Sequence, residues 1–397
     1  MQVETIKDID VAGKKVLVRV DFNVPFDVKT GDITDDNRIR ASIPTIRYLI
    51  EKGSKTILCS HLGRPDGKVV EGLRLGVVAE RLSQLLGQPI SALKDSIGSE
   101  VETTIAKMNE GEVVLLENIR FYPEEEQNDD SFSQALAKLA DVYVDDAFGT
   151  AHRSHASIVG VANILPSVAG MLLQKEIEAL GAVMESPVRP LCGLLGGAKI
   201  SDKVGMLDNI MDKTDVILIG GGMAATFLKA LSYETGKSLI EENMLDTAVR
   251  IIKNARSTGV KVLFPSDVVI ADEISNEAKV INTVPINEIP SHLRIVDIGQ
   301  KTIEDFRKEL SVCKTVFWNG PMGIYEYPGF AYGTKQIAEY LSGLDAVIII
   351  GGGSTADAVG DLGLADKMSF VSTGGGATLK FLSGKALPGV EVLLKKT

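Results

Sequence analysis

Residues 346–360 read AVIIIGGGSTADAVG, and this stretch carries the three signals that decide the predicted fold. The β-branched run at its start is typical of a buried strand. The glycines Gly351, Gly352 and Gly353 allow a tight turn, and the residues after them are typical of a helix. A strand that leads directly into a helix is the repeating unit of a parallel sheet with helices on its faces.

The same order of signals recurs along the chain. In the first part, apolar runs followed by amphipathic segments stand at 14–25 (KKVLVRVDFNVP), 54–63 (SKTILCSHLG), 112–121 (EVVLLENIRF) and 141–150 (DVYVDDAFGT). In the second part they stand at 189–199 (RPLCGLLGGAK), 214–224 (TDVILIGGGMA), 260–270 (VKVLFPSDVVI), 314–323 (KTVFWNGPMG) and 345–353 (DAVIIIGGG). Strands that are apolar throughout are covered on both faces. We therefore predict an α/β protein with two doubly wound, Rossmann-like parallel-sheet domains.

The length of the chain, 397 residues, also favours two domains over one core. Residues 172–183 (LLQKEIEALGAV) have a helical pattern and lie where one series of strands ends and the next begins. We predict a first domain at 1–170, a second domain at 171–380, a hinge helix that joins them, and a C-terminal segment at 381–397.

The composition argues against several classes of protein. A formal charge of −11 and a pI near 5.1 disfavour broad contact with nucleic acid or an anionic membrane, because both need a net basic face. Cys59, Cys192 and Cys313 have no metal-like spacing, and the polar N-terminus does not resemble a secretory signal. We expect a cytoplasmic protein that binds neither nucleic acid nor membranes.

One uncharged segment, 156–174 (ASIVGVANILPSVAGMLLQ), has the length of a membrane span. It contains Asn163 and Pro166, which are unfavourable in a lipid-facing helix. We therefore interpret it as a buried linker between the domains.

Basic residues stand close to the ends of the strands in the first part. They are Arg38, His61, Arg64, Arg120, His152 and Arg153, with Asp21 and Asn23 after the first strand. Arg38 precedes a predicted helix. Ligands of doubly wound sheets bind beyond the carboxyl ends of the strands, so these side chains should converge. Any one arginine could form a surface ion pair, but the group predicts a site for a small, multiply charged anion.

Two other interpretations of this region are weaker. His152 and His155, with Asp145 and Asp146 nearby, could suggest a metal site, but their spacing does not complete a tetrahedral ligand set. A hydrolytic triad is disfavoured because no G-x-S-x-G turn follows a strand.

The second part has glycine clusters where strands end. They are Gly196–Gly197, Gly220–Gly222, Gly351–Gly353 and Gly374–Gly376. Glycine lets the backbone approach a phosphate, and the helix behind it offers free N–H groups. Lys199 and Lys203 follow the first cluster and could reach a phosphate chain, although a solvated lysine pair would look the same. Together the clusters predict a nucleotide site.

Other nucleotide-binding patterns fit less well. GGGMAA (220–225) and GGGSTA (351–356) match the loose dinucleotide pattern, which expects an acidic residue at the end of the next strand, about twenty residues on. After Gly222 the next predicted strand, VKVLF, ends about forty residues later, and after Gly353 the chain is nearly over. A complete Walker sequence is also absent. An anion site in one domain and a nucleotide site in the other predict phosphoryl transfer across a cleft that closes on its substrates.

The motifs that carry these sites resemble the phosphoglycerate kinase family. In order they are RVDFNVP, SHLGRPDG, LLENIRF, DAFGTAHRSHAS, GGAKISDK, GGGMAATFLK, WNGPMGIYE, GGGSTADAV and VSTGGGATLKFLSGKALPGV, from residue 19 to 390. The resemblance implies a monomeric, two-domain glycolytic kinase. It would transfer the acyl phosphate of 1,3-bisphosphoglycerate to ADP, with Mg²⁺, giving 3-phosphoglycerate and ATP.

The resemblance also implies the residues of both sites. The first domain would hold the phosphoglycerate through Asp21, Phe22, Asn23, Arg38, His61, Leu62, Gly63, Arg64, Arg120 and Arg153. The second would hold the nucleotide through Gly197, Lys199, Lys203, Gly220, Gly221, Gly222, Pro321, Glu326, Gly352, Gly353, Ser354 and Thr355, with a phosphate loop at Gly374, Gly375 and Gly376. Arg38, Lys199 and Lys203 would be the catalytic cations. The C-terminal segment would return to the first domain.

One position departs from the family pattern. The family has an aspartate near the nucleotide-bound Mg²⁺ where this chain has Ser354. Ser354 with Asp357 fits a capping box, so the serine is predicted to cap a helix that begins at Ser354 or Thr355. Alternatively, the Ser354 hydroxyl binds the metal or its water. A non-catalytic nucleotide-binding protein is the competing function if the missing charge is essential.

Overall fold

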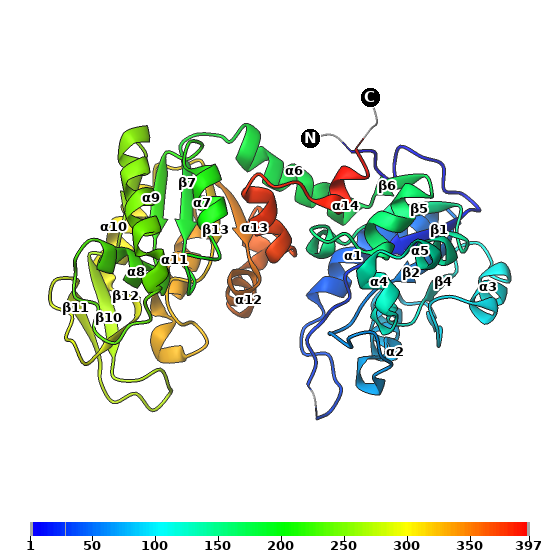
Figure 1. The fold of residues 1–397 in the computed structure, drawn as a ribbon, viewed down its shortest axis with the longest axis horizontal. Coiled ribbons are helices and arrows are strands. Elements are labelled where there is room, and N and C mark those ends of the chain that lie inside the picture. Colours follow the sequence, from blue (N-terminus) through cyan, green and yellow to red (C-terminus); the bar gives the residue numbers. More distant parts are fainter. Residues whose placement is uncertain (1–2, 28, 395–397) are drawn as a thin grey trace. The chain divides into compact units, whose positions relative to one another are not determined.

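The computed structural model describes residues 3–27 and 29–394. Two compact units make up the chain: Met1–Glu178 with Ala386–Thr397, and Ala179–Lys385. The division falls within helix α6 (Met171–Glu185), whereas the sequence placed it at residue 170, before this helix. In Figure 1 each unit has a sheet with helices on its faces.

The first unit contains a six-stranded sheet, in the order β3-β4-β2-β1-β5-β6, whose neighbouring strands all pair in parallel. The strands are β1 (Lys15–Arg19), β2 (Lys55–Cys59), β3 (Ser91–Ala92), β4 (Val113–Leu115), β5 (Val142–Asp145) and β6 (Ser167–Ala169). The predicted parallel sheet is therefore confirmed for this unit.

Helices cover both faces of this sheet because successive side chains of each strand point to opposite sides. The helices are α1 (Asn37–Glu51), α2 (Gly76–Leu86), α3 (Ser99–Ala106), α4 (Pro123–Gln127) and α5 (Asp130–Ala137). Val16 and Val18 of β1 pack in one core with α1 and α2. Leu17, between them, packs in a second core with α3 and α5.

The uncharged segment 156–174 lies wholly within the first unit, so its interpretation as a linker between the domains is wrong. It forms a π-helical turn at Ala156–Gly160, a 3₁₀ turn at Val161–Asn163 and strand β6, which pairs with β5. Within residues 3–27 and 29–394, no helix is long and apolar enough to cross a membrane.

The second unit contains another six-stranded parallel sheet, in the order β15-β14-β13-β7-β8-β9. The strands are β7 (Leu191–Leu195), β8 (Val216–Ile219), β9 (Lys261–Leu263), β13 (Thr315–Asn319), β14 (Val347–Gly351) and β15 (Phe370–Val371). The helices are α7 (Val204–Ile210), α8 (Met223–Ala230), α9 (Leu245–Thr258), α10 (Gln300–Leu310), α11 (Tyr332–Leu341), α12 (Gly353–Asp361) and α13 (Gly376–Leu382).

A three-stranded antiparallel sheet in the second unit was not predicted from the sequence. Its strands are β10 (Asp267–Ala271), β11 (Ile281–Pro285) and β12 (Arg294–Ile298), in the order β11-β10-β12. The single strand predicted at 260–270 is wrong, because β9 and β10 belong to different sheets. Pro265 stands between them and has no N–H group to donate to a continuous ladder.

The chain returns to the first unit after α13. Helix α14 (Pro388–Glu391) lies there, and the backbone N–H of Gly389 donates to the carbonyl of Ala151 at 2.9 Å. An isolated bridge between Val3 and Leu394 joins the two ends of the described chain.

Candidate functional site

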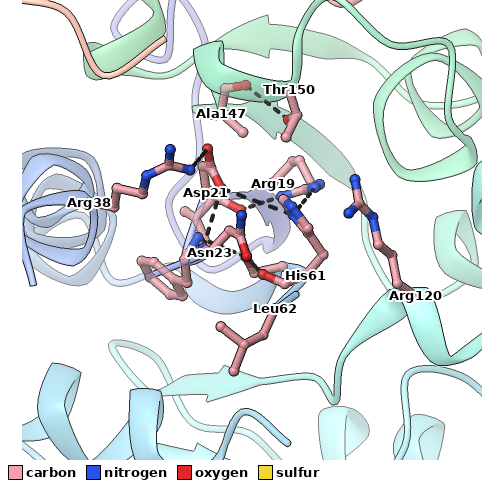
Figure 2. A network of polar contacts seen from close by, with 12 residues as sticks. Arg19, Asp21, Asn23, Arg38, His61, Leu62, Arg120, Ala147 and Thr150 are labelled. Carbon is pink, nitrogen blue, oxygen red and sulfur yellow. Dashed lines mark hydrogen bonds and ion pairs between the residues drawn. The ribbon is translucent and has the colours of Figure 1, made fainter. Parts of the chain in front are cut away.

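Charged side chains of the first unit gather beyond the carboxyl ends of β1, β2, β4 and β5, as the parallel sheet requires. Figure 2 shows Asp21 between Arg38 and His61. An Nη of Arg38 lies 2.6 Å from Asp21 Oδ2, and His61 Nδ1 lies 4.0 Å from Asp21 Oδ1. Arg38 is in the first turn of α1 and does not precede that helix as predicted.

Arg19, which sequence reasoning missed, contacts this group through His61. It is the last residue of β1, its side chain is fully buried, and one Nη lies 3.1 Å from His61 Nδ1. Its Nε donates to Ser157 Oγ at 3.0 Å, and the Ser157 hydroxyl donates to the buried Glu125 at 2.6 Å. The available signal was a charged residue at the end of an otherwise apolar strand.

The contact with Arg19 determines the protonation of His61. Arginine has only donors, so His61 Nδ1 must accept, and the ring proton is on Nε2. Burial, followed by the charges of Arg19 and Arg120, holds the pKa of His61 well below its usual value. The site therefore contains a neutral imidazole with one N–H to donate.

Arg120 and Arg153 have unused donors. Arg120 is buried, and its Nη1 donates to the carbonyl of Gly63 at 3.0 Å. In the part of the chain that the structure describes, Arg120 Nε and Nη2 and Arg153 Nε are buried without a hydrogen-bond acceptor. Burial, followed by the charge of Arg153, lowers the pKa of Arg120 to about 10. The two guanidinium groups share one carboxylate, because Glu126 Oε1 lies 3.4 Å from Arg120 Nε and 3.9 Å from Arg153 Nη1. These ion pairs do not satisfy the buried donors, and unsatisfied buried donors are costly, so the arrangement is suited to an anion that supplies the missing acceptors.

The other predicted substrate residues have different environments. Asn23 Oδ1 accepts from the Gly63 N–H at 2.8 Å and so holds the loop after β2. Phe22 and Leu62 are buried in the core, where they support the backbone of the site. Arg64 is exposed, and none of its side-chain atoms bonds to another described residue.

The alternative metal site gains no support. The Asp145 carboxylate accepts from the Ala147 N–H at 2.9 Å, and that of Asp146 accepts from the Leu172 N–H at 2.8 Å. His155 Nδ1 lies 3.6 Å from Glu125 Oε1. Among the described residues, no group of three or more histidine, cysteine and acidic side chains is placed to hold a metal.

The second unit has a cavity of about 640 Å³ beyond the carboxyl ends of β7, β8 and β13. Below it is called the second-unit cavity. Of the predicted nucleotide residues, Gly197, Gly221, Gly222, Pro321, Glu326 and Ser354 line it. The sequence did not predict the contributions of Ala198, Ala225, Lys237, Ser238, Leu239, Ile240, Ile274, Arg294, Ile295, Val296, Gly323 and Ile324. Several of these come from the antiparallel sheet or its neighbouring loops, which carried no recognised motif.

The glycine loops at this cavity bind one another. The N–H of Gly197 donates to the Pro321 carbonyl and that of Gly221 to the Met322 carbonyl, each at 2.9 Å. A Cβ on Gly221 would lie 2.4 Å from the backbone nitrogen of Gly197. These glycines are therefore required for close packing of backbones, and these two N–H groups are already used within the protein.

The two predicted lysines differ in burial. Lys203 is buried and its ammonium group donates to Asn319 Oδ1, whereas Lys199 is exposed. Burial lowers the pKa of Lys203 to about 8. Lys203 thus supplies a partly desolvated cation, and Lys199 a solvent-exposed one.

Ser354 does not cap α12, so this prediction is wrong. The helix begins at Gly353, and its N-cap is Gly352, whose φ of +92° favours glycine. Ser354 is exposed and lines the cavity from the first turn of α12. Thr355 is buried, and its hydroxyl accepts from the Gly320 N–H at 2.6 Å, which gives it a structural role.

The remaining predicted glycines lie outside the described lining of the cavity. Gly220 directly follows β8, and Gly353 is the first residue of α12. Gly374, Gly375 and Gly376 precede and begin α13, where the Gly374 N–H donates to Ser372 Oγ at 3.1 Å. Their proposed contact with phosphate stays a prediction.

Comparison with known proteins identifies the family of the chain. The model of the phosphoglycerate kinase family matches residues 6–385. The chain is similar to phosphoglycerate kinase from Dictyoglomus turgidum, with 56% identity over 392 residues and 98% of each chain covered. It is also similar to that of Pelotomaculum thermopropionicum, with 51% identity over 396 residues and 100% of each covered.

Solved structures give the same result. Phosphoglycerate kinase from Coxiella burnetii is similar with a TM-score of 0.88, at 38% identity over 99% of each chain. That from Pyrococcus horikoshii OT3 is similar with a TM-score of 0.86, at 32% identity over 98% of each chain. By sequence over nearly its whole length, and by fold, the chain belongs to the phosphoglycerate kinase family.

Proposed function

We propose that this protein transfers the acyl phosphate of 1,3-bisphosphoglycerate to ADP, and catalyses the reverse reaction with 3-phosphoglycerate and ATP. The observation that carries the proposal is the set of buried guanidinium donors of Arg120 and Arg153 that have no hydrogen-bond acceptor among the described residues, although both groups form longer ion pairs with Glu126. A phosphate ester supplies the acceptors that these groups lack, and arginine matches phosphate geometry.

The first unit binds the phosphoglycerate in this proposal. Arg120, Arg153 and the exposed Arg64 bind the ester phosphate, and the Nε2–H of His61 donates to a substrate oxygen. Asp21 orients Arg38 through their 2.6 Å contact. Asn23 keeps the loop after β2 in place through Gly63.

The second unit binds the nucleotide in the second-unit cavity. Its volume and largely apolar lining are suited to a nucleoside. The positive end of α12 and the ammonium groups of Lys199 and Lys203 bind the phosphates. Arg38 and Lys199 stabilise the charge of the phosphoryl group during transfer, which requires that the two units bring their ligands together.

The residues present fit Mg²⁺ bound with the nucleotide. Mg²⁺ takes few protein ligands and is held mainly by phosphates and water, so the exposed Ser354 hydroxyl on the cavity can serve as its contact. The ion would neutralise phosphate charge. We further propose a cytoplasmic monomer that acts in glycolysis.

A coupled assay of ATP formation from 1,3-bisphosphoglycerate and MgADP tests the proposal. The expected result is turnover by the wild-type protein, with a rate that falls by about 100-fold or more in Arg38→Ala. ADP binding without any ATP formation in the wild-type protein would instead assign a non-catalytic nucleotide-binding function.

A further inference from the structure

Arg294 contributes an unpaired cation to the second-unit cavity. It is the first residue of β12 and lines the cavity together with Ile295 and Val296. Its Nε is buried and has no hydrogen-bond acceptor among the described residues. Within residues 3–27 and 29–394, no carboxylate lies within salt-bridge distance of its guanidinium group.

The surroundings of Arg294 do not compensate for its buried donor. The lining of the cavity is largely apolar, with Ala225, Leu239 and Ile274 among its side chains. Hydrogen bonds to charged groups contribute about 1.5–3 kcal/mol, and a buried charged donor without an acceptor loses this contribution. A ligand that presents acceptors to Arg294 would therefore gain affinity.

Arg294 belongs to a different wall of the cavity from the groups suited to phosphates. Ser354 enters from α12, and Gly197 from the loop that leads to Lys203. Arg294 comes from the antiparallel sheet, where the Ile295 N–H donates to Ser238 Oγ at 2.9 Å. We place the phosphates of the proposed nucleotide at α12, which leaves the lining contributed by β12 for its base.

The bases differ in what they offer to an arginine. Guanine and hypoxanthine present two acceptors, O6 and N7, which a guanidinium group can bind in a bidentate way. Adenine presents N7 beside an amino group, so one arginine donor would face another donor. We propose that Arg294 reads this edge of the base, and that the protein accepts 6-oxopurine nucleotides at least as well as adenine nucleotides. This inference rests on the proposed nucleotide site.

Calorimetric titration of the full-length protein with ADP, GDP and IDP, each with Mg²⁺, tests the inference. The expected result is that GDP and IDP bind with a Kd equal to or below that of ADP. The diphosphate of 7-deazaguanosine, which lacks N7, should bind at least about threefold more weakly than GDP. This probe requires no change to the protein, so it is independent of the folding of any variant.

Arg294→Met is the matched substitution. It should weaken GDP and IDP binding by about tenfold or more, equivalent to about 1.4 kcal/mol, and should strengthen ADP binding because a facing donor is removed. Lys237→Met, which removes another cation from the same cavity, should leave the ratio of the GDP and ADP dissociation constants unchanged.

Three results would overturn the inference. The first is a wild-type protein that binds ADP more than tenfold better than GDP and IDP. The second is an equal loss for all three nucleotides in Arg294→Met, which would place a phosphate at this side chain. The third is that Arg294→Met leaves the affinity for all three nucleotides unchanged. Failure of ADP itself to bind would overturn the proposed function as well, so the two failures can be told apart.

Discussion

A guanidinium nitrogen of Arg19 lies 3.1 Å from Nδ1 of His61, and both side chains are buried. A protonated imidazole would place a second donor against this nitrogen. The contact therefore keeps His61 neutral in the middle of a cluster of cations. A neutral ring donates one hydrogen bond from Nε2 and adds no further positive charge to the site.

The first prediction concerns the pKa of His61. In the wild-type protein this ring should be neutral at pH 6.5, the usual pKa of histidine, because burial and the charges of Arg19 and Arg120 lower its pKa. Arg19→Met should raise that pKa, since it removes the nearest of these charges. NMR titration of the imidazole nitrogens can follow this, since the chain has only four histidines. Titration of His61 near pH 6.5 in the wild-type protein would contradict the prediction.

The second prediction separates binding from catalysis at Arg38. A charge that stabilises the transferring phosphoryl group acts mainly in the transition state. Arg38→Ala should therefore lower kcat by about 100-fold or more, while KM for 3-phosphoglycerate changes far less. Steady-state kinetics of the reverse reaction measure both values. Arg64→Ala is the control, because an arginine that only binds the ester phosphate should mainly raise KM. A raised KM with unchanged kcat in Arg38→Ala would exclude the catalytic role.

The sequence predicted that Asp21, His61 and Arg120 would converge, for a physical reason. Parallel strands place their carboxyl ends at one edge, so residues that follow different strands lie close together there. Arg19 was missed because its partners are distant in sequence: Ser157, which it contacts, is 138 residues away. No local pattern indicates that a charge at the end of an apolar strand will be paired in the core.

The second site was predicted less completely. Glycine clusters look the same whether they approach a phosphate or another loop, and here Gly197 and Gly221 bind neighbouring loops. Arg294 lies in the antiparallel sheet of the second unit. From the sequence, β10 was assigned to the parallel sheet, and β11 and β12 were not recognised. Cap positions also depend on backbone angles, so the choice between Gly352 and Ser354 could not be made from residue types.

The third prediction is that nucleotide affinity depends on the protonation of Lys203. Burial lowers its pKa to about 8, so the ammonium group is present below pH 8 and is lost as pH rises through this value. The Kd of ADP should therefore increase between pH 7 and 9. Lys203→Arg should remove this dependence, because arginine stays protonated throughout. Calorimetry at several pH values measures the effect, and a flat wild-type profile would show that Lys203 does not bind the phosphates.

The fourth prediction concerns the start of α6. Asp146 Oδ1 accepts from the N–H groups of Leu172 and Leu173, at 2.8 and 3.4 Å. Burial raises the pKa of Asp146 to about 7 from an ordinary value of 3.8. In this window the native state binds more protons than the unfolded state, so stability should fall as pH rises, by at most about 1.4 kcal/mol per pH unit.

Asp146→Asn tests this dependence while keeping an acceptor for both N–H groups. Hydrogen exchange of the Leu172 and Leu173 amides at pH 5 and 7 reports the free energy of local opening, after correction for intrinsic exchange rates. As pH rises, the free energy of local opening should fall more in the wild-type protein than in Asp146→Asn. Equal pH dependence in the two proteins would show that Asp146 does not titrate in this range.

The last prediction addresses the missing carboxylate at Ser354. Its hydroxyl is neutral, and it lies exposed on the cavity in the first turn of α12. A carboxylate there would attract the metal and would also interact favourably with the positive end of the helix. Ser354→Asp should therefore strengthen ADP binding at millimolar Mg²⁺, but not in excess chelator, where its charge would repel the phosphates. Ser354→Asn, of similar size but without charge, is the control. If the affinity of Ser354→Asp for ADP stays equal to that of the wild type across a Mg²⁺ titration, the phosphates and water hold the ion without help from this side chain.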